Sequence, residues 1–183
     1  MPMCRTFIAI QFPDHVADQL CSLPQDLLMA KWVPEDNLHL TLEFLGELNS
    51  RELDDLMLAL GRLMHEPITM RFSGLGVFGD DRPRTLFANP VDATPLIELQ
   101  LRVQAAVKRA GLQCKRRKYK PHTTLAKISR TPSYMTGEYL EREGAFRTEP
   151  FQIHEFSLLE SQLGNDVPVY SPIAIFPMLR KAA

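Results

Sequence analysis

Alternating apolar and polar residues predict several short strands along the chain, separated by stretches with the spacing of helices. The strand-like runs are rich in β-branched and aromatic residues and end at residues that favour turns, such as Gly, Pro, Asn and Asp. They cover residues 6–12, 31–33, 38–45, 68–72, 85–89, 122–125, 151–159 and 167–177. The last two runs are joined across Gly164, Asn165 and Asp166, which predicts a hairpin.

Amphipathic helices are predicted between some of these runs. One begins at Asp14. The next follows Asn49 and Glu52, whose spacing predicts a capping box, and it runs to about residue 65. A longer helix covers residues 94–109 and is expected to stop at Gly111, because glycine readily adopts the conformation that ends a helix.

The order of these elements predicts a duplicated α+β fold. We expect the glycine-rich segment 74–84 and the polar segment 129–150 to be loops. Helices and strands then alternate in two comparable halves, with no linker or low-complexity segment between them. Several connections are too short for a crossover helix, which predicts antiparallel sheets. Residues 1–183 should therefore form a single duplicated domain.

One short motif occurs twice, once in each half: His39-Leu40-Thr41-Leu42 and His122-Thr123-Thr124-Leu125. Successive side chains of a strand point to opposite faces, so the His and Thr of each copy should share one face while the residues between them face the core. The same alternation would place Glu43 beside His39 and Thr41. A single copy is weak evidence because the pattern arises by chance, but two matched copies on strands predict a joint site.

Two imidazoles and two hydroxyls suit acid–base chemistry on a phosphate ester. One imidazole can take a proton from attacking water while the other gives a proton to the leaving oxygen, and histidine can do both near neutral pH. The hydroxyls of Thr41 and Thr124 would donate hydrogen bonds to the non-bridging oxygens of a 2′,3′-cyclic phosphate. The alternative for both threonines is the preference of this residue for strands.

Charge is informative only locally. The formal net charge of -1 gives no overall reason to bind nucleic acid or an anionic membrane. A basic run does precede the second motif and surrounds Tyr119: Lys115, Arg116, Arg117, Lys118 and Lys120. This run would either steer a phosphate backbone or form a solvated strand entrance.

The remaining composition argues for a cytoplasmic protein. Cys4, Cys21 and Cys114 are widely spaced and form no Cys-x-x-Cys pattern, which argues against a disulfide framework or a structural zinc site. We find no signal peptide and no run that approaches the roughly 20 apolar residues of a membrane span. The absence of a heptad pattern predicts a monomer.

Beyond the two motifs, further segments carry a family resemblance. They read RTFIAI at residues 5–10, NLHLTLEFLG at 37–46, PRTLFA at 83–88 and KPHTTLAK at 120–127. Together they resemble the 2H phosphoesterase superfamily, and within it the bacterial and archaeal RNA 2′,3′-cyclic phosphodiesterases, also called LigT-like proteins or 2′-5′ RNA ligases. The resemblance covers nearly the whole chain.

The resemblance implies both a fold and a reaction. The fold is two pseudo-symmetric lobes, each an antiparallel sheet flanked by helices, around a central cleft lined by both motifs. His39 would donate a proton to the departing 3′ oxygen and His122 would activate water, which leaves a 2′-phosphomonoester; the reverse reaction would form a 2′-5′ bond. Relatives often carry arginine where this chain has Lys127, so a bidentate phosphate clamp would be replaced by a point charge.

Other residues are less determined by the sequence. Phe7 and Tyr170 would stack on a base or fill the core, and Phe44 is expected to fill the core. We expect no cofactor and no metal, because a His-x-x-x-His pattern is missing and a strained cyclic phosphate does not require a Lewis acid.

The sequence thus predicts an enzyme that hydrolyses RNA 2′,3′-cyclic phosphate ends. Two alternatives remain open: a non-catalytic module that binds RNA ends or nucleotides, and the same chemistry on another cyclic nucleotide or a 2′-5′ oligonucleotide.

Overall fold

The strands form one large antiparallel sheet and one small one. A computed structural model of the chain describes residues 4–79, 81–114, 118–162 and 167–179. The elements, in chain order, are β1 (Cys4–Gln11), α1 (Asp14–Cys21), β2 (Lys31–Trp32), η1 (Glu35–Asn37), β3 (His39–Leu48), α2 (Ser50–Gly61), β4 (Ile68–Met70), β5 (Phe72–Phe78), β6 (Thr85–Pro90), α3 (Thr94–Arg109), β7 (Thr123–Lys127), α4 (Ser133–Glu143), β8 (Phe151–Ile153), β9 (Glu155–Gln162) and β10 (Val169–Pro177). The large sheet has the order β10-β9-β1-β3-β7-β6-β5, with β2 also paired to β7, and β4 pairs with β8 in the small sheet. Each of these pairings is antiparallel, as predicted.

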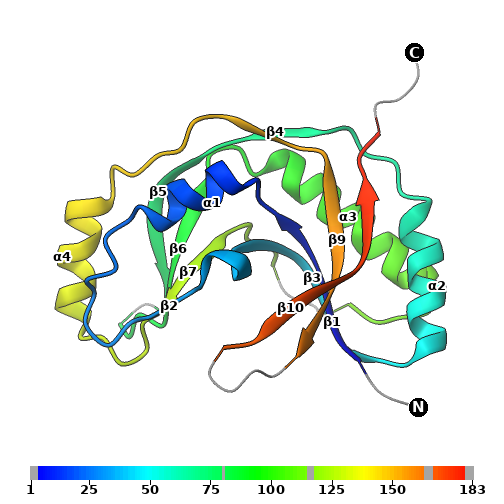
Figure 1. Ribbon diagram of the computed structural model, residues 1–183, viewed down its shortest axis with the longest axis horizontal. Coiled ribbons are helices and arrows are strands. Elements are labelled where there is room, and N and C mark those ends of the chain that lie inside the picture. Colours follow the sequence, from blue (N-terminus) through cyan, green and yellow to red (C-terminus); the bar gives the residue numbers. More distant parts are fainter. Residues whose placement is uncertain (1–3, 80, 115–117, 163–166, 180–183) are drawn as a thin grey trace.

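The strands β3 and β7 join the two halves of the large sheet (Figure 1). The C-terminal strands β9 and β10 extend the half that contains β1 and β3. In return β2, from the N-terminal part of the chain, pairs with β7 of the other half. The two halves are therefore not successive segments of the sequence, because each includes strands that are distant in the chain from the rest of that half.

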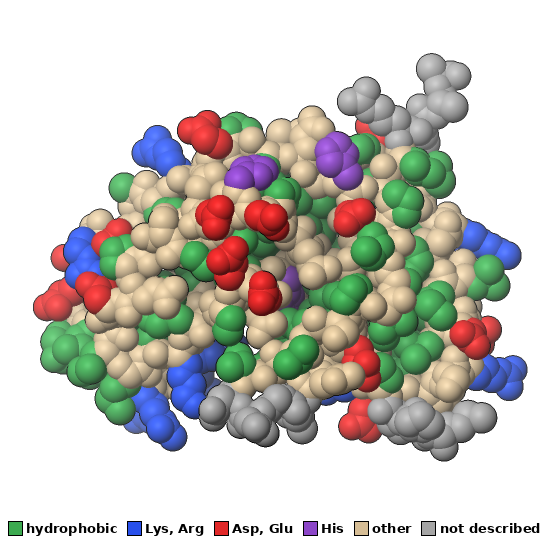
Figure 2. Space-filling model, in the orientation of Figure 1, with side chains coloured by type: hydrophobic (Ala, Val, Ile, Leu, Met, Phe, Trp, Pro, Cys, Tyr) green, Lys and Arg blue, Asp and Glu red, His purple; other side chains and the backbone are tan. Residues whose placement is uncertain are grey.

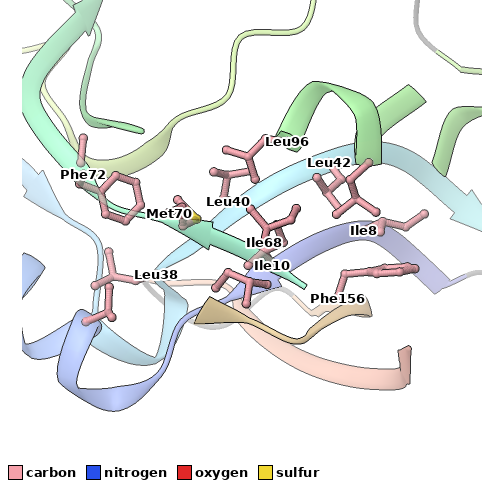
Figure 3. Close-up of a cluster of buried hydrophobic side chains, with 14 of the residues drawn as sticks. Ile8, Ile10, Leu38, Leu40, Leu42, Ile68, Met70, Phe72, Leu96 and Phe156 are labelled. Carbon is pink, nitrogen blue, oxygen red and sulfur yellow. The ribbon is translucent and has the colours of Figure 1, made fainter. Parts of the chain in front are cut away.

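One face of the large sheet is buried. Leu40 and Leu42 of β3 point into the same cluster as Ile8 of β1 and Leu96 of α3 (Figure 3). Residues of α1 and of the small sheet belong to this core as well. Burying each such side chain contributes roughly 1.5–3 kcal/mol, so the apolar residues within and after the motifs fix which face of β3 and β7 lies inside. The opposite face is left for the histidines.

The capping box predicted for α2 is present. The backbone N–H of Glu52 donates to Oδ1 of Asn49 at 3.1 Å, and the backbone N–H of Asn49 donates to Oε2 of Glu52 at 2.8 Å. None of the helices in the described ranges is both long and apolar enough to cross a bilayer.

The prediction of a loop over residues 74–84 is wrong in its first half, because residues 72–78 form β5. Pairing with β6 overrides the poor strand preference of glycine. Gly76 also has a packing role: a Cβ at this position would lie 2.7 Å from Cζ of Phe87. The phenyl ring of Phe87 thus lies against the backbone of β5, where only glycine leaves room.

The polar segment 129–150 is not simply a loop either, since it contains α4. Few residues of this helix are buried, and its sequence accordingly lacks the apolar stripe by which an amphipathic helix is predicted. Tertiary contacts hold it instead: Tyr139 donates a hydrogen bond of 2.9 Å to the carbonyl of Pro24, and Arg142 forms an ion pair with Asp26. The predicted turn at 164–166 lies outside the described residues.

Candidate active site

The two His-x-Thr motifs lie side by side in the sheet. Leu40 pairs with Thr123 in the antiparallel register of β3 and β7. Counting one residue outward from this pair sets His39 opposite Thr124 and Thr41 opposite His122. The two histidines are then diagonal neighbours, a relationship that separates backbones by roughly 7–8 Å. Side chains at that spacing can reach a single phosphate group from two sides.

A β-bulge follows each motif, at the same position in both copies. Between β1 and β3 the register skips Leu42, and between β6 and β7 it skips Leu125. An extra residue in one strand reverses the alternation of faces beyond it. Phe44 and Lys127 therefore lie on the same side of the sheet as the histidines. We call the side that carries His39, Thr41, Phe44, His122, Thr124 and Lys127 the histidine face.

The bulge also corrects the position expected for Glu43. Simple alternation would place Glu43 beside His39 and Thr41, but its side chain lies on the buried face and is 6% exposed. There it accepts hydrogen bonds from Nε2 of Gln104 at 2.7 Å and of Gln100 at 3.4 Å, both on α3. This carboxylate anchors α3 to β3 and is not beside the imidazoles. No group of three or more potential metal-ligating side chains occurs within the described part of the chain.

Each imidazole is oriented by a hydrogen bond to a backbone carbonyl two residues earlier in the chain. Nδ1 of His39 lies 2.7 Å from the carbonyl oxygen of Asn37, and Nδ1 of His122 lies 2.7 Å from that of Lys120. A carbonyl can only accept, so each Nδ1 carries the proton and donates it. The Nε2 atom of each neutral ring is therefore the basic one. It can accept a proton, or donate one once the ring is charged.

His39 lies half-buried among aromatic side chains. Its ring lies 5.0 Å from the centroid of Phe7 and 5.2 Å from that of Tyr170. Burial lowers the pKa of His39, the hydrogen bond to Asn37 opposes this shift, and the positive charges of His122 and Lys127 lower the pKa further. Both side chains are thus within electrostatic range of His39, and the lowered pKa favours its neutral form.

His122 has aromatic neighbours of its own. Its ring lies 4.7 Å from the centroid of Phe78 and 5.4 Å from that of Phe87, in edge-on arrangements. The ammonium group of Lys120 lies 5.0 Å from the centroids of both phenyl rings. The sequence did not indicate that Phe78 lies beside His122, because Phe78 belongs to the segment that was expected to be a loop.

The structure separates the roles of the aromatic residues considered from the sequence. Phe7 is 3% exposed and packs against His39, Phe44 and Tyr170, which fits a support for the imidazole. Tyr170 is half-buried and remains a candidate for contact with a base. The prediction that Phe44 fills the core is wrong: it is 40% exposed, because the bulge at Leu42 turns it toward the histidine face.

Part of the basic run can be placed. Lys115, Arg116 and Arg117 lie outside the described residues, whereas Lys118, Tyr119 and Lys120 lie within them. The Tyr119 hydroxyl donates a hydrogen bond of 3.0 Å to the carbonyl of Thr41. This bond ties the segment before His122 to the first motif strand, a role that no sequence pattern indicated. A separate cavity of about 330 Å³, lined by residues such as Met64, Glu98 and Arg102, is lined by neither His39 nor His122.

The fold and the paired motif strands define a class, the 2H phosphoesterases. The chain belongs to the 2′-5′ RNA ligase superfamily, whose family model matches residues 12–165. It is 30% identical to an RNA 2′,3′-cyclic phosphodiesterase of Bacillus subtilis (strain 168), over 94% of this chain and 95% of that protein. It is 29% identical to an RNA 2′,3′-cyclic phosphodiesterase of Aquifex aeolicus (strain VF5), over 96% of this chain and 98% of that protein.

Solved structures share the fold. A crystal structure of a protein from Thermus thermophilus superposes with a TM-score of 0.76 at 28% identity and covers 95% of this chain and 97% of its own. E. coli LigT in its apo form superposes with a TM-score of 0.80 at 22% identity and covers 98% of this chain and 100% of its own. The α+β fold class expected from the sequence is confirmed.

Proposed function

We propose that this chain hydrolyses RNA 2′,3′-cyclic phosphate ends to 2′-phosphomonoesters by a two-histidine acid–base mechanism that needs no metal ion. The observation that carries the proposal is the register of β3 and β7, which brings both motifs to one face with each Nδ1 proton committed to a carbonyl. The names of the Bacillus subtilis and Aquifex aeolicus relatives support the choice of reaction. The three cysteines are free, which fits the cytoplasmic location expected from the sequence.

In this mechanism His122 takes a proton on Nε2 from the water that attacks phosphorus. The bond from phosphorus to the 3′ oxygen breaks, and His39 donates the proton on its Nε2 to that oxygen. Thr41 and Thr124 donate hydrogen bonds to the non-bridging oxygens, and the ammonium group of Lys127 offsets their charge. Replacing water by a 5′-hydroxyl in the reverse direction would form a 2′-5′ bond.

The acid role of His39 requires the substrate itself. Without substrate, burial is the main cause that favours neutral His39, and the charge of Lys127 adds to it. An anionic phosphate beside the ring favours the imidazolium and raises the pKa again. His39 would then acquire its proton as the cyclic phosphate binds, while His122 acts as the base.

The proposal is tested with nucleoside 2′,3′-cyclic phosphates and a short RNA that ends in one, before and after exhaustive EDTA treatment. We expect the wild type to release only 2′-phosphomonoesters with unchanged rate after EDTA. His39→Ala and His122→Ala should each lower kcat by roughly 10²–10⁴-fold. His154→Ala is the matched control, because His154 is exposed and lies outside both motifs.

Other outcomes identify the alternatives. Binding of cyclic ends without turnover by the wild type would indicate a non-catalytic binding module. Turnover confined to another cyclic nucleotide or to 2′-5′ oligonucleotides would keep the acid–base pair and change the substrate.

A further inference from the structure

Two lysines lie directly opposite each other at one end of the histidine face. Lys31 of β2 pairs with Lys127 of β7, and Lys127 in turn pairs with Thr85 of β6. Like charges directly opposite each other in a sheet are destabilising. Both lysine residues are exposed, and the described residues contain no salt bridge to either. Anionic groups close to the two ammonium groups would offset this repulsion.

The pair faces the same side as the catalytic candidates. The neighbouring pair, Trp32 and Ala126, belongs to the opposite face, where Trp32 packs against Tyr139 of α4. Lys31 therefore points away from α4, to the histidine face. In Figure 2, Lys and Arg side chains gather at the lower left, below the position of β2 in Figure 1.

The lysine pair also lies in line with the motif residues along β7 and its neighbouring strands. Both β3 and β2 lie on the edge of β7 that does not pair with β6. Along that edge His39 lies opposite Thr124, and Lys31 lies opposite Lys127, three residues further along β7. Three residues along a strand span about 10 Å. A lysine side chain that bends toward the histidines brings its ammonium group closer to them than this backbone distance. Burial is the main cause that lowers the pKa of His39, and the positive charge of Lys127 contributes to the same shift.

We propose that Lys31 and Lys127 form a subsite for two successive phosphates of an RNA end. Lys127 contacts the cyclic phosphate held between the histidines, and Lys31 contacts the phosphodiester on the 5′ side of the terminal nucleotide. This inference rests on the function proposed above and narrows its substrate class. The preferred substrate is an RNA end of at least two nucleotides, and a mononucleoside cyclic phosphate lacks the group that Lys31 recognises.

The experiment compares a nucleoside 2′,3′-cyclic phosphate with a dinucleotide that ends in the same cyclic phosphate. For the wild type we expect a higher kcat/KM on the dinucleotide. Lys31→Ala should lower that kcat/KM on the order of tenfold, through KM, as expected when one hydrogen bond to a charged group is lost. The same variant should leave the mononucleotide reaction nearly unchanged.

Two further measurements make the test independent of turnover. Lys31→Ala should bind the dinucleotide 2′-phosphate product more weakly than the wild type. In a plot of the logarithm of the binding constant against the logarithm of salt concentration, the slope should become shallower by about 0.7. Lys108→Ala is the matched control, because it removes one exposed lysine from α3, the helix that packs on the opposite face of β3. Lys31→Gln keeps most of the length of the side chain and a polar end without the charge, and it should reproduce the effect of Lys31→Ala.

Equal losses on both substrates, or no loss on either, would overturn the subsite while the proposed hydrolysis stands. A wild type that cleaves neither substrate would overturn the proposed function and this inference with it.

Discussion

Leu40 and Thr123 face each other across β3 and β7, and each directly follows one of the two histidines. Both side chains are fully buried, so this pair lies in the core while its neighbours in the motifs lie on the histidine face. The two positions differ in chemistry. Within the described part of the structure, the hydroxyl of Thr123 is buried without a hydrogen-bond partner. An unsatisfied polar group of this kind costs about 1–3 kcal/mol.

We predict that Thr123→Val stabilises the protein. The substitution keeps the branched shape and removes the unpaired hydroxyl, so the free energy of unfolding should rise by about 1 kcal/mol. Urea unfolding measures this change, and kcat should remain within about twofold of the wild type, on the argument that Thr123 does not reach the phosphate. Thr124→Val is the contrasting variant: it should lower activity with little effect on stability. A clear loss of stability in Thr123→Val would show that the hydroxyl is satisfied in solution.

A second prediction concerns protons taken up on binding. Burial, with a smaller contribution from the charge of Lys127, holds the pKa of His39 below its ordinary value. A bound phosphate would raise this pKa. Between these two pKa values the complex carries a proton that the free protein lacks. Binding of a nucleoside 2′-phosphate should therefore tighten as pH falls toward 6, with net proton uptake measured by calorimetry in buffers of different ionisation enthalpy.

The lowered pKa of His39 also affects stability: a fall in pH that tightens phosphate binding makes the protein less stable. The unfolded chain binds the His39 proton more readily than the folded protein, so unfolding becomes easier as pH falls through the ordinary pKa of about 6.5. His39→Gln should reduce both the proton uptake and this part of the pH dependence of unfolding. If His39→Gln takes up as many protons on binding as the wild type, another group is responsible for the proton uptake.

The limits of sequence reasoning are visible within the motif strands. Alternation predicted His39 and Thr41 on one face, because the first four motif positions follow the regular period of a strand. It failed at Glu43 and Phe44, because the bulge at Leu42 reverses the period and nothing in the local sequence marks that bulge. Lys127 was assigned to the phosphate by resemblance alone, and only the matching bulge at Leu125 explains how it reaches the histidine face.

Other features depend on contacts between distant segments. The pairing of β9 with β1 joins residues far apart in the chain, so local patterns could not predict how the halves exchange strands. The helix α4 was missed because its stability comes from the contacts of Tyr139 and Arg142 rather than from an apolar stripe. The paired hydrogen bonds that orient the imidazoles also needed three-dimensional information, since they are made by backbone carbonyls.

The last prediction concerns Tyr119 as a positioning residue. Its hydroxyl donates to the carbonyl of Thr41, and the carbonyl of the next residue, Lys120, accepts the hydrogen bond from Nδ1 of His122. The second imidazole is thus tied to the backbone of the first motif through two hydrogen bonds and one peptide unit. Burial raises the pKa of Tyr119, and nearby Glu43 raises it further, so the hydroxyl stays protonated as a donor.

We expect Tyr119→Phe to lower kcat on the order of tenfold with little change in KM, because the lost hydrogen bond of about 1 kcal/mol loosens His122 without removing a phosphate contact. The pH profile of kcat should shift as well, since a displaced imidazole meets a different environment. Tyr134→Phe is the matched control, because Tyr134 is exposed on α4. If Tyr119→Phe loses stability but keeps the kcat and pH profile of the wild type, Tyr119 supports the fold alone.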